Sequence, residues 1–142
     1  MPPIGPPPLA GNWACHTPPG DGTWTIGEVW IDRQSGRLAL FVTTAHCNPF
    51  DVMHGGALAT FADYQCAALR DYSDDGADHT PTVTLSVDYL APVPRDRWLL
   101  AEVTLLRGTG SLIFTQAVMT VDGAMVGRSN AIYRSFKRKD AP

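Results

Sequence analysis

The sequence lacks the features that mark several common classes of protein. Eleven Lys and Arg residues stand against fourteen Asp and Glu residues, a net charge of −3, so the basic excess typical of nucleic-acid-binding proteins is missing. No apolar run approaches the ~20 residues that cross a bilayer, and prolines stand where a signal peptide needs a charged segment followed by an apolar one. We therefore expect a cytoplasmic protein with neither a nucleic-acid partner nor a membrane partner.

Cysteine is also scarce. Cys15, Cys47 and Cys66 are widely spaced and form no Cys-x-x-Cys pair, and neither they nor the four histidines show metal-ligand spacing. We expect three reduced thiols with structural roles, no disulfide framework and no metal site.

Proline is scarce beyond the N-terminus, because seven of the twelve prolines fall within residues 1–19. Proline-rich segments favour a polyproline-like conformation, so we expect residues 1–20 to form a loosely attached extension without helix or sheet ladder. Trp13 is the candidate residue that anchors this extension to the domain. Residues 21–142 then form one domain of about 120 residues. A domain of this size has little chain left to wall a deep pocket, which favours an oligomer.

The remaining pattern predicts an α+β fold. Apolar residues at helical spacing, many of them alanine, predict one long helix over residues 54–70. Residues 82–89 alternate apolar and polar side chains without error, which predicts a half-buried strand. Six antiparallel strands are expected in all, over residues 24–31, 38–42, 82–89, 98–106, 112–121 and 125–136. With a single helix, the sheet should wrap the helix or pack it on one face.

The predicted helix carries two features that point to chemistry. Asp63 lies among apolar neighbours, where an unpaired buried carboxylate is costly; it either points outward, bonds a backbone amide or has a catalytic role. Gly55 and Gly56 follow His54 at the start of the helix, where free N–H groups and the positive end of the helix dipole suit an oxyanion. Simple loop-to-helix geometry is the alternative explanation for the two glycines.

The spacing of these residues resembles the hotdog-fold acyl-CoA thioesterases, of the phenylacetate-degradation type. The matching residues are Asn48, the triplet His54-Gly55-Gly56, Asp63 and the strand over residues 82–89. This resemblance implies an antiparallel sheet of about six strands wrapped around one central helix, with active sites at a dimer interface. The proline-rich extension has no counterpart in the family that we can assign.

The resemblance also implies roles for individual residues. Asp63 matches the catalytic carboxylate, the backbone N–H at Gly55 matches the group that polarises the thioester carbonyl, and Asn48 matches a residue that orients the reacting groups. Thr82 stands where the family often has a hydroxyl residue that helps to place water, and His54 is expected to support the loop. Asp51 is a departure, because relatives often have glycine there.

The predicted helix separates two of these groups. Gly55 and Asp63 are eight residues apart, which corresponds to about 12 Å along a helix axis, whereas donor and base must both lie close to one carbonyl. Two helices packed antiparallel about a two-fold axis bring Gly55 of one chain to Asp63 of the other. We therefore expect a homodimer with two equivalent sites, and a dimer of dimers as in related proteins.

Further residues are candidates for substrate contact. Gly56 and Phe61 belong to the helix, and Phe61 together with Trp24 is a candidate for lining an acyl tunnel as well as the core. The segment Arg107, Gly108, Thr109 and Gly110 either meets a phosphate of CoA or forms a plain hairpin turn.

The sequence thus predicts hydrolysis of an acyl-CoA thioester, with Asp63 as general base or as nucleophile. No cofactor is expected, since CoA is part of the substrate. A hotdog hydratase or dehydratase and a non-catalytic acyl-CoA or small-ligand binding protein are the alternatives.

Overall fold

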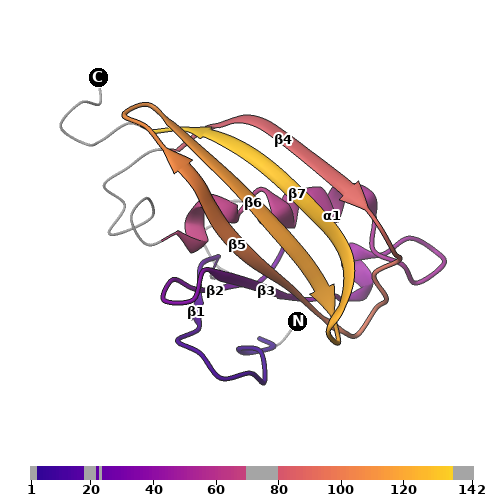
Figure 1. Ribbon diagram of the computed structural model, residues 1–142. Helices are drawn as coiled ribbons and strands as arrows, with labels where there is room; N and C mark the ends of the chain where they lie inside the picture. Colours follow the sequence, from indigo (N-terminus) through magenta and orange to yellow (C-terminus); the bar gives the residue numbers. More distant parts are fainter. Residues whose placement is uncertain (1–2, 18–21, 23, 70–79, 136–142) are drawn as a thin grey trace.

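A computed structural model of the chain describes residues 3–17, 22, 24–69 and 80–135. The described residues form seven strands in one antiparallel sheet, ordered β1-β2-β3-β5-β6-β7-β4, and the sheet curves around the helix α1 (Figure 1). The expected α+β fold, with a sheet wrapped around one helix, is confirmed. The elements are β1 (Ala14–Cys15), β2 (Val29–Asp32), β3 (Arg37–Phe41), η1 (Thr44–His46), α1 (Gly55–Ala62), η2 (Gln65–Ala68), β4 (Thr82–Tyr89), β5 (Trp98–Gly108), β6 (Leu112–Val121) and β7 (Ala124–Arg134).

The bounds predicted for the four strands that follow the helix are close to those observed. The bounds of β4 and β6 agree with those expected, β5 runs two residues further, and β7 begins one residue earlier. The expected start of the first long strand is wrong, because Gly27 has a φ of 118° and β2 begins only at Val29. The expected end of the last strand, at residue 136, lies outside the described residues.

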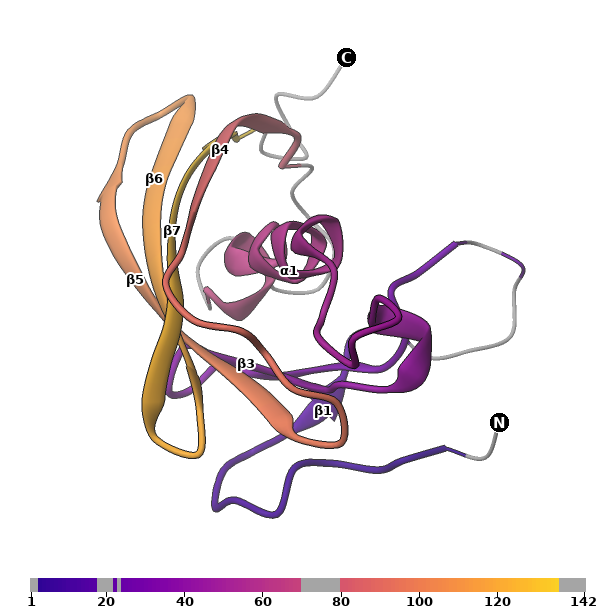
Figure 2. The same ribbon diagram turned by 90° about the vertical axis from the view of Figure 1, so that its right-hand side faces the viewer.

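The hydrophobic core lies between α1 and the concave face of the sheet. Leu58, Phe61 and Ala62 face it from the helix, and alternate residues of the strands face it from the sheet, for example Leu38 and Leu40 of β3. Figure 2 shows α1 on one side of β3 and the N-terminal segment on the other side. Among the described residues, no helix is both long and apolar enough to span a membrane.

The helix is shorter than expected, because it ends at Ala62 and Asp63 caps it. The hydroxyl of Tyr133 donates a hydrogen bond to the carbonyl oxygen of Asp63 (2.8 Å), which in a continuous α-helix accepts from Ala67. The N–H of Ala67 bonds the carbonyl of Tyr64 instead, so the chain tightens into the 3₁₀-helix η2. The rest of the expected helix, to residue 69, continues as η2 and its C-cap; residue 70 lies outside the described residues.

Buried polar contacts hold η2 against the sheet. The side chain of Gln65 is fully buried, accepts a hydrogen bond from Thr115 (2.8 Å) and donates one to Ser129 (3.0 Å). The hydroxyl of Ser129 in turn donates to the carbonyl of Ser86 (2.8 Å). Because buried polar groups that find partners specify one arrangement, this network fixes the chain that follows Asp63 relative to β4, β6 and β7.

The expectation that residues 1–20 form no ladder is wrong, because Ala14 and Cys15 pair with β2 and supply the seventh strand. The anchor is the buried carboxylate of Asp32, which accepts hydrogen bonds from Arg37 (2.9 Å) and from the N–H of Asn12 (3.3 Å). Arg37 also stacks on the ring of Trp13, 4.7 Å from its centre. Trp13 thus contributes to the anchor, as expected.

Candidate active site

Asp63 lies where α1 ends and β4 begins. The hydroxyl of Thr82, the first residue of β4, lies 2.8 Å and 3.1 Å from the two carboxylate oxygens of Asp63 and donates to them. Asp63 is half-buried, and its carbonyl oxygen is held by Tyr133. The structure therefore brings together Asp63 and Thr82, which the sequence proposed separately.

This environment controls the charge of Asp63. Burial raises the pKa of the Asp63 carboxyl above its ordinary value, and hydrogen bonds from Thr82 and from Tyr133 offset part of that increase. Burial and the neighbouring charge of Asp63 raise the pKa of Tyr133, so this hydroxyl remains a donor. The result is a partly desolvated carboxylate whose basicity is enhanced, as a general base or an attacking group requires.

Gly55 is the first residue of α1, and His54 is its N-cap. The first N–H groups of a helix have no partner within the helix, so the amide of Gly55 is suited to bind an oxyanion. The hydroxyl of Tyr89 donates to the carbonyl of Gly55 (2.7 Å), and a Cβ at Gly55 would lie 3.4 Å from the Tyr89 ring. A Cβ at Gly56 would meet nothing within 4 Å. The two glycines therefore leave the helix start open, and His54 is exposed beside them without capping it through its side chain.

The loop before the helix is shaped by Asn48. Its side-chain oxygen accepts hydrogen bonds from the N–H groups of Phe50 (2.9 Å) and Val52 (3.3 Å), so this oxygen serves the loop itself. Asp51, the departure from the family pattern, has a φ of 62°. This left-handed conformation favours glycine and is tolerated by Asp.

A cavity of about 360 Å³ opens beside the start of α1. It is lined mainly by apolar side chains: Val52, Met53, Gly55, Leu58, Tyr89, Leu90, Ala91, Pro92 and Val93. Phe61 is fully buried in the core and lines neither this cavity nor a second cavity, which lies beneath the N-terminal segment. Trp24 is 75% exposed. Phe61 thus packs the core and does not line a described pocket.

Arg107 and Gly108 end β5, and residues 109–111 form the turn between β5 and β6. The side chain of Thr109 accepts hydrogen bonds from the N–H groups of Ser111 (3.3 Å) and Leu112 (2.9 Å), which is the pattern of a closed hairpin turn. Gly108, Ile113, Tyr133 and Thr82 lie in one row across the sheet, so the turn sits at the Asp63 end, about three strand spacings or 14 Å from Thr82.

The two ends of α1 hold different chemical groups. Gly55 and Tyr89 lie at one end, and Asp63 and Thr82 lie at the other, about 12 Å away along the helix. One chain therefore does not place the amide of Gly55 beside its own Asp63. Sequence reasoning missed Tyr133 and Tyr89, because their partners lie 70 and 34 residues away and no local pattern announces them.

Comparisons with known proteins agree with this architecture. The Thioesterase superfamily model matches residues 50–127, more than half of the chain, and includes α1, Asp63 and β4. No curated protein matches the sequence.

Three solved structures illustrate the structural likeness. A hypothetical thioesterase protein from Streptococcus pneumoniae TIGR4, solved with coenzyme A, is 18% identical over 71% of this chain and 80% of its own (TM-score 0.63). Thioesterase superfamily member 2 from zebrafish is 21% identical over 69% and 72% (TM-score 0.60). A phenylacetic acid degradation-related protein from Ralstonia eutropha JMP134 is 25% identical over 72% and 79% (TM-score 0.62). The family match and the shared architecture together establish that this chain belongs to the Thioesterase superfamily and has the hotdog fold.

Proposed function

We propose that this protein hydrolyses an acyl-CoA thioester to the free acid and CoA. In the base mechanism the carboxylate of Asp63 removes a proton from water, and the resulting hydroxide attacks the thioester carbonyl while the amide of Gly55 stabilises the oxyanion. The C–S bond then breaks and the CoA thiolate takes up a proton. In the nucleophile mechanism the carboxylate attacks first and forms an anhydride that water cleaves.

One observation carries this proposal: the carboxylate of Asp63 is partly desolvated and held by the hydroxyl of Thr82. Its raised pKa strengthens it as a base, and the hydrogen bond from Thr82 favours its ionised form. Within a thioesterase fold, such a carboxylate is the group that thioester hydrolysis needs. Membership of the superfamily supports the reaction class.

We further propose that the working unit is a homodimer in which Gly55 of one chain faces Asp63 of the other, with a dimer of dimers as the larger assembly. The 12 Å separation along α1 argues for this arrangement. β4 is an edge strand, and Val83 and Tyr89 on it are 57% and 55% exposed, which leaves an apolar edge for a second copy to cover.

CoA recognition is part of the same proposal. The structure from Streptococcus pneumoniae holds coenzyme A, and a protein from Bacillus halodurans (20% identical, TM-score 0.63) was also solved with CoA. Arg107 is exposed at the Asp63 end of the sheet and is our candidate cation for a CoA phosphate, with the N–H groups of Gly108 and Gly110 beside it. The likeness to the Ralstonia eutropha protein supports the phenylacetate-degradation type.

A thiol-release assay against short, medium, long-chain and aryl acyl-CoAs tests the function. We expect release of CoA from at least one class, and we expect Asp63→Asn to remove most of it while leaving the fold intact by circular dichroism. Hydration without thiol release supports a hotdog hydratase instead, and tight binding without turnover supports a binding protein. Hydrolysis by Asp63→Asn at the parent rate refutes the assigned role of Asp63.

A further inference from the structure

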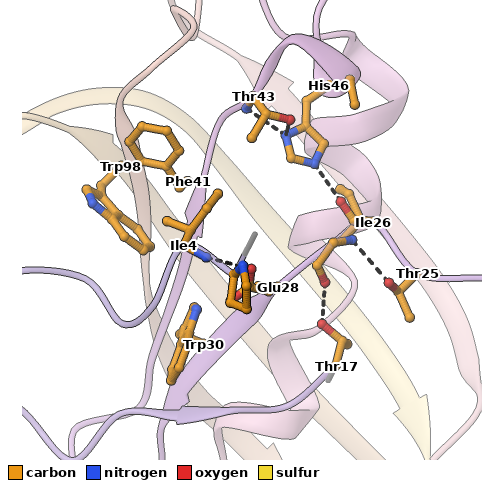
Figure 3. Close-up of a pocket in the computed structure, with 13 residues that line it drawn as sticks. Ile4, Thr17, Thr25, Ile26, Glu28, Trp30, Phe41, Thr43, His46 and Trp98 are labelled. Atoms are coloured by element: carbon orange, nitrogen blue, oxygen red, sulfur yellow. Dashed lines mark hydrogen bonds between the residues drawn. The ribbon is translucent and has the colours of Figure 1, made fainter. Parts of the chain in front are cut away.

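A second cavity, of about 270 Å³, lies beneath the N-terminal segment (Figure 3). Pro3 and Ile4 lie on one side of it, and residues of β2, β3 and β5 lie on the other. Its volume is near the lower end of the range for small-molecule sites, so it suits a ligand of few heavy atoms.

The cavity lies on the face of the sheet away from α1. Val29 and Ile31 of β2 enter the core. Trp30, which lies between them, and Glu28, which precedes Val29, therefore point to the opposite face of the sheet. The same alternation places Phe41 of β3 and Trp98 of β5 on that face, next to core residues Leu40 and Leu99. The aromatic residues that line this cavity therefore lie on the face of the sheet opposite α1, and the core residue Ile26 borders the cavity at one edge.

Three aromatic side chains gather around this cavity. Phe41 and Trp98 are direct partners across neighbouring strands, and their rings pack edge to face with centroids 5.4 Å apart. Trp30 is paired with Ala39, whose small side chain leaves the space beside Phe41 open. Figure 3 shows Phe41, Trp98 and Trp30 on one side of the labelled residues, with Ile4 and Glu28 between them and Ile26.

Two polar groups define what this aromatic cavity can hold. The indole N–H of Trp30 is buried and is the one buried side-chain donor without a partner among the described residues. Glu28 is the one carboxylate among the described lining residues, and it accepts a hydrogen bond from the N–H of Ile4 (2.9 Å). His46 also lines the cavity, but its Nδ1 accepts from the N–H of Thr43 and its Nε2 bonds the carbonyl of Ile26, so both ring nitrogens already have partners within the chain.

We propose that this cavity is a second binding site, for a small alkylated ammonium compound that carries a hydrogen-bond acceptor. The rings of Trp30, Phe41 and Trp98 that line the cavity suit a cation with an apolar surface, and the carboxylate of Glu28 supplies the complementary charge. The acceptor of the ligand satisfies the indole N–H of Trp30, whose burial without a partner is otherwise costly. The site is distinct from the proposed hydrolytic site, because Asp63, Gly55 and Thr82 are not among its described lining residues. The one link that the backbone shows is the carbonyl of His46, which accepts a hydrogen bond from the N–H of His54 (2.8 Å) among the described residues.

Choline and its uncharged isostere 3,3-dimethyl-1-butanol test the proposal with the full-length protein. The two compounds share shape and hydroxyl and differ only in charge. By isothermal titration calorimetry we expect choline to bind with a Kd at least about tenfold lower than that of the alcohol. Equal affinity for the two compounds overturns the assignment of a cation, and the absence of saturable choline binding overturns the site.

Variants separate the contributions. Glu28→Gln should weaken choline binding about tenfold and leave the alcohol unchanged, whereas Glu102→Gln, which changes an exposed carboxylate on β5 outside the cavity, should change neither. Trp30→Phe keeps an aromatic ring and removes the N–H, so it should weaken choline more than tetramethylammonium, which has no acceptor and loses only part of the ring's attraction. An equal loss for the two cations contradicts the role of the indole N–H.

Two controls keep these results interpretable. Thermal unfolding of each variant reports whether it folds, and Asp63→Asn should bind choline as the parent does. A loss of choline binding in Asp63→Asn, with the fold intact, contradicts the independence of the two sites. Failure of hydrolysis with choline binding retained affects only the proposed function.

Discussion

Replacing Gly55 by proline removes the proposed oxyanion donor with little other change. Gly55 is the first residue of α1, the position at which proline is well tolerated in helices, because its missing N–H has no partner within the helix. His54 before it has φ −56° and ψ 139°, an extended conformation compatible with a following proline. The Cβ of the new residue would meet the Tyr89 ring at 3.4 Å, an ordinary contact distance.

The expected effect on catalysis is large and the effect on folding is small. Loss of one oxyanion donor lowers kcat by about 10²- to 10³-fold, which corresponds to roughly 3–4 kcal/mol of transition-state stabilisation. The free energy of unfolding should change by less than about 1 kcal/mol. Thiol release under saturating substrate measures kcat, and urea denaturation measures stability.

Gly55→Ala is the matched control, because it adds the same Cβ and keeps the N–H. We expect it to retain activity within a few-fold of the parent, and Gly56→Ala, whose Cβ points into open space, to do the same. An unchanged kcat in Gly55→Pro, or an equally large loss in Gly55→Ala, refutes the role of this amide.

Three other perturbations follow from the contacts around α1 and β2. Because only the ionised Asp63 carboxylate accepts a proton, kcat/KM should fall as pH decreases through its raised pKa. Thr82→Val removes a donor that favours the ionised form, so the acid limb of the pH–rate profile should move to higher pH. An acid limb that does not move contradicts the proposed effect of Thr82 on Asp63. Tyr133→Phe leaves the carbonyl of Asp63 without its partner and should lower the free energy of unfolding by about 1–3 kcal/mol in urea titrations. The loss should exceed that of Tyr89→Phe, whose hydrogen bond lies at the exposed end of α1. Equal losses in the two variants argue against the hydrogen bond of Tyr133 as the contact that fixes the end of the helix. Burial of Asp32 opposes its ionisation, but its hydrogen bonds outweigh burial and lower its pKa, so the ionised carboxylate stabilises the folded protein above the ordinary aspartate pKa and this stabilisation is lost as pH falls through the lower folded pKa. Asp32→Asn should therefore lower the free energy of unfolding by about 2–3 kcal/mol at pH 7 and by much less at pH 2. A loss of stability that does not depend on pH excludes this linkage.

The strands could be predicted from the sequence because their signal is local. Alternation along β4 gave its bounds, and the turn residues on either side of β6 gave the bounds of that strand and marked the hairpin to β7. The start of β2 could not be predicted in this way, because apolar residues continue upstream of Gly27 while its positive φ and the hydroxyl of Thr17, which donates to its carbonyl, end the ladder.

The end of the helix depends on residues that are distant in the sequence. Apolar spacing continues through Cys66 and Leu69, so a local analysis extends the helix past Asp63. Tyr133, from β7, takes the carbonyl that would continue the helix, and Gln65 is drawn into a buried network with the sheet. The position of the candidate catalytic carboxylate at a helix end thus results from tertiary contacts.

The N-terminal segment shows the same limit. Its prolines predict a segment without ladder pairing, yet β1 joins the sheet because the buried carboxylate of Asp32 takes the N–H of Asn12, 20 residues away. Composition describes what a segment prefers alone, and it does not reveal a partner elsewhere in the chain.

Complementation between two inactive variants tests the shared active site most directly. In a dimer of one Gly55→Pro chain and one Asp63→Asn chain, one site carries both defects and the other carries none. Random pairing of co-expressed chains makes half of the dimers mixed, each with one intact site of two, so thiol release should recover to about one quarter of the parent rate. Activity no higher than the mean of the two single variants would contradict an active site shared between chains.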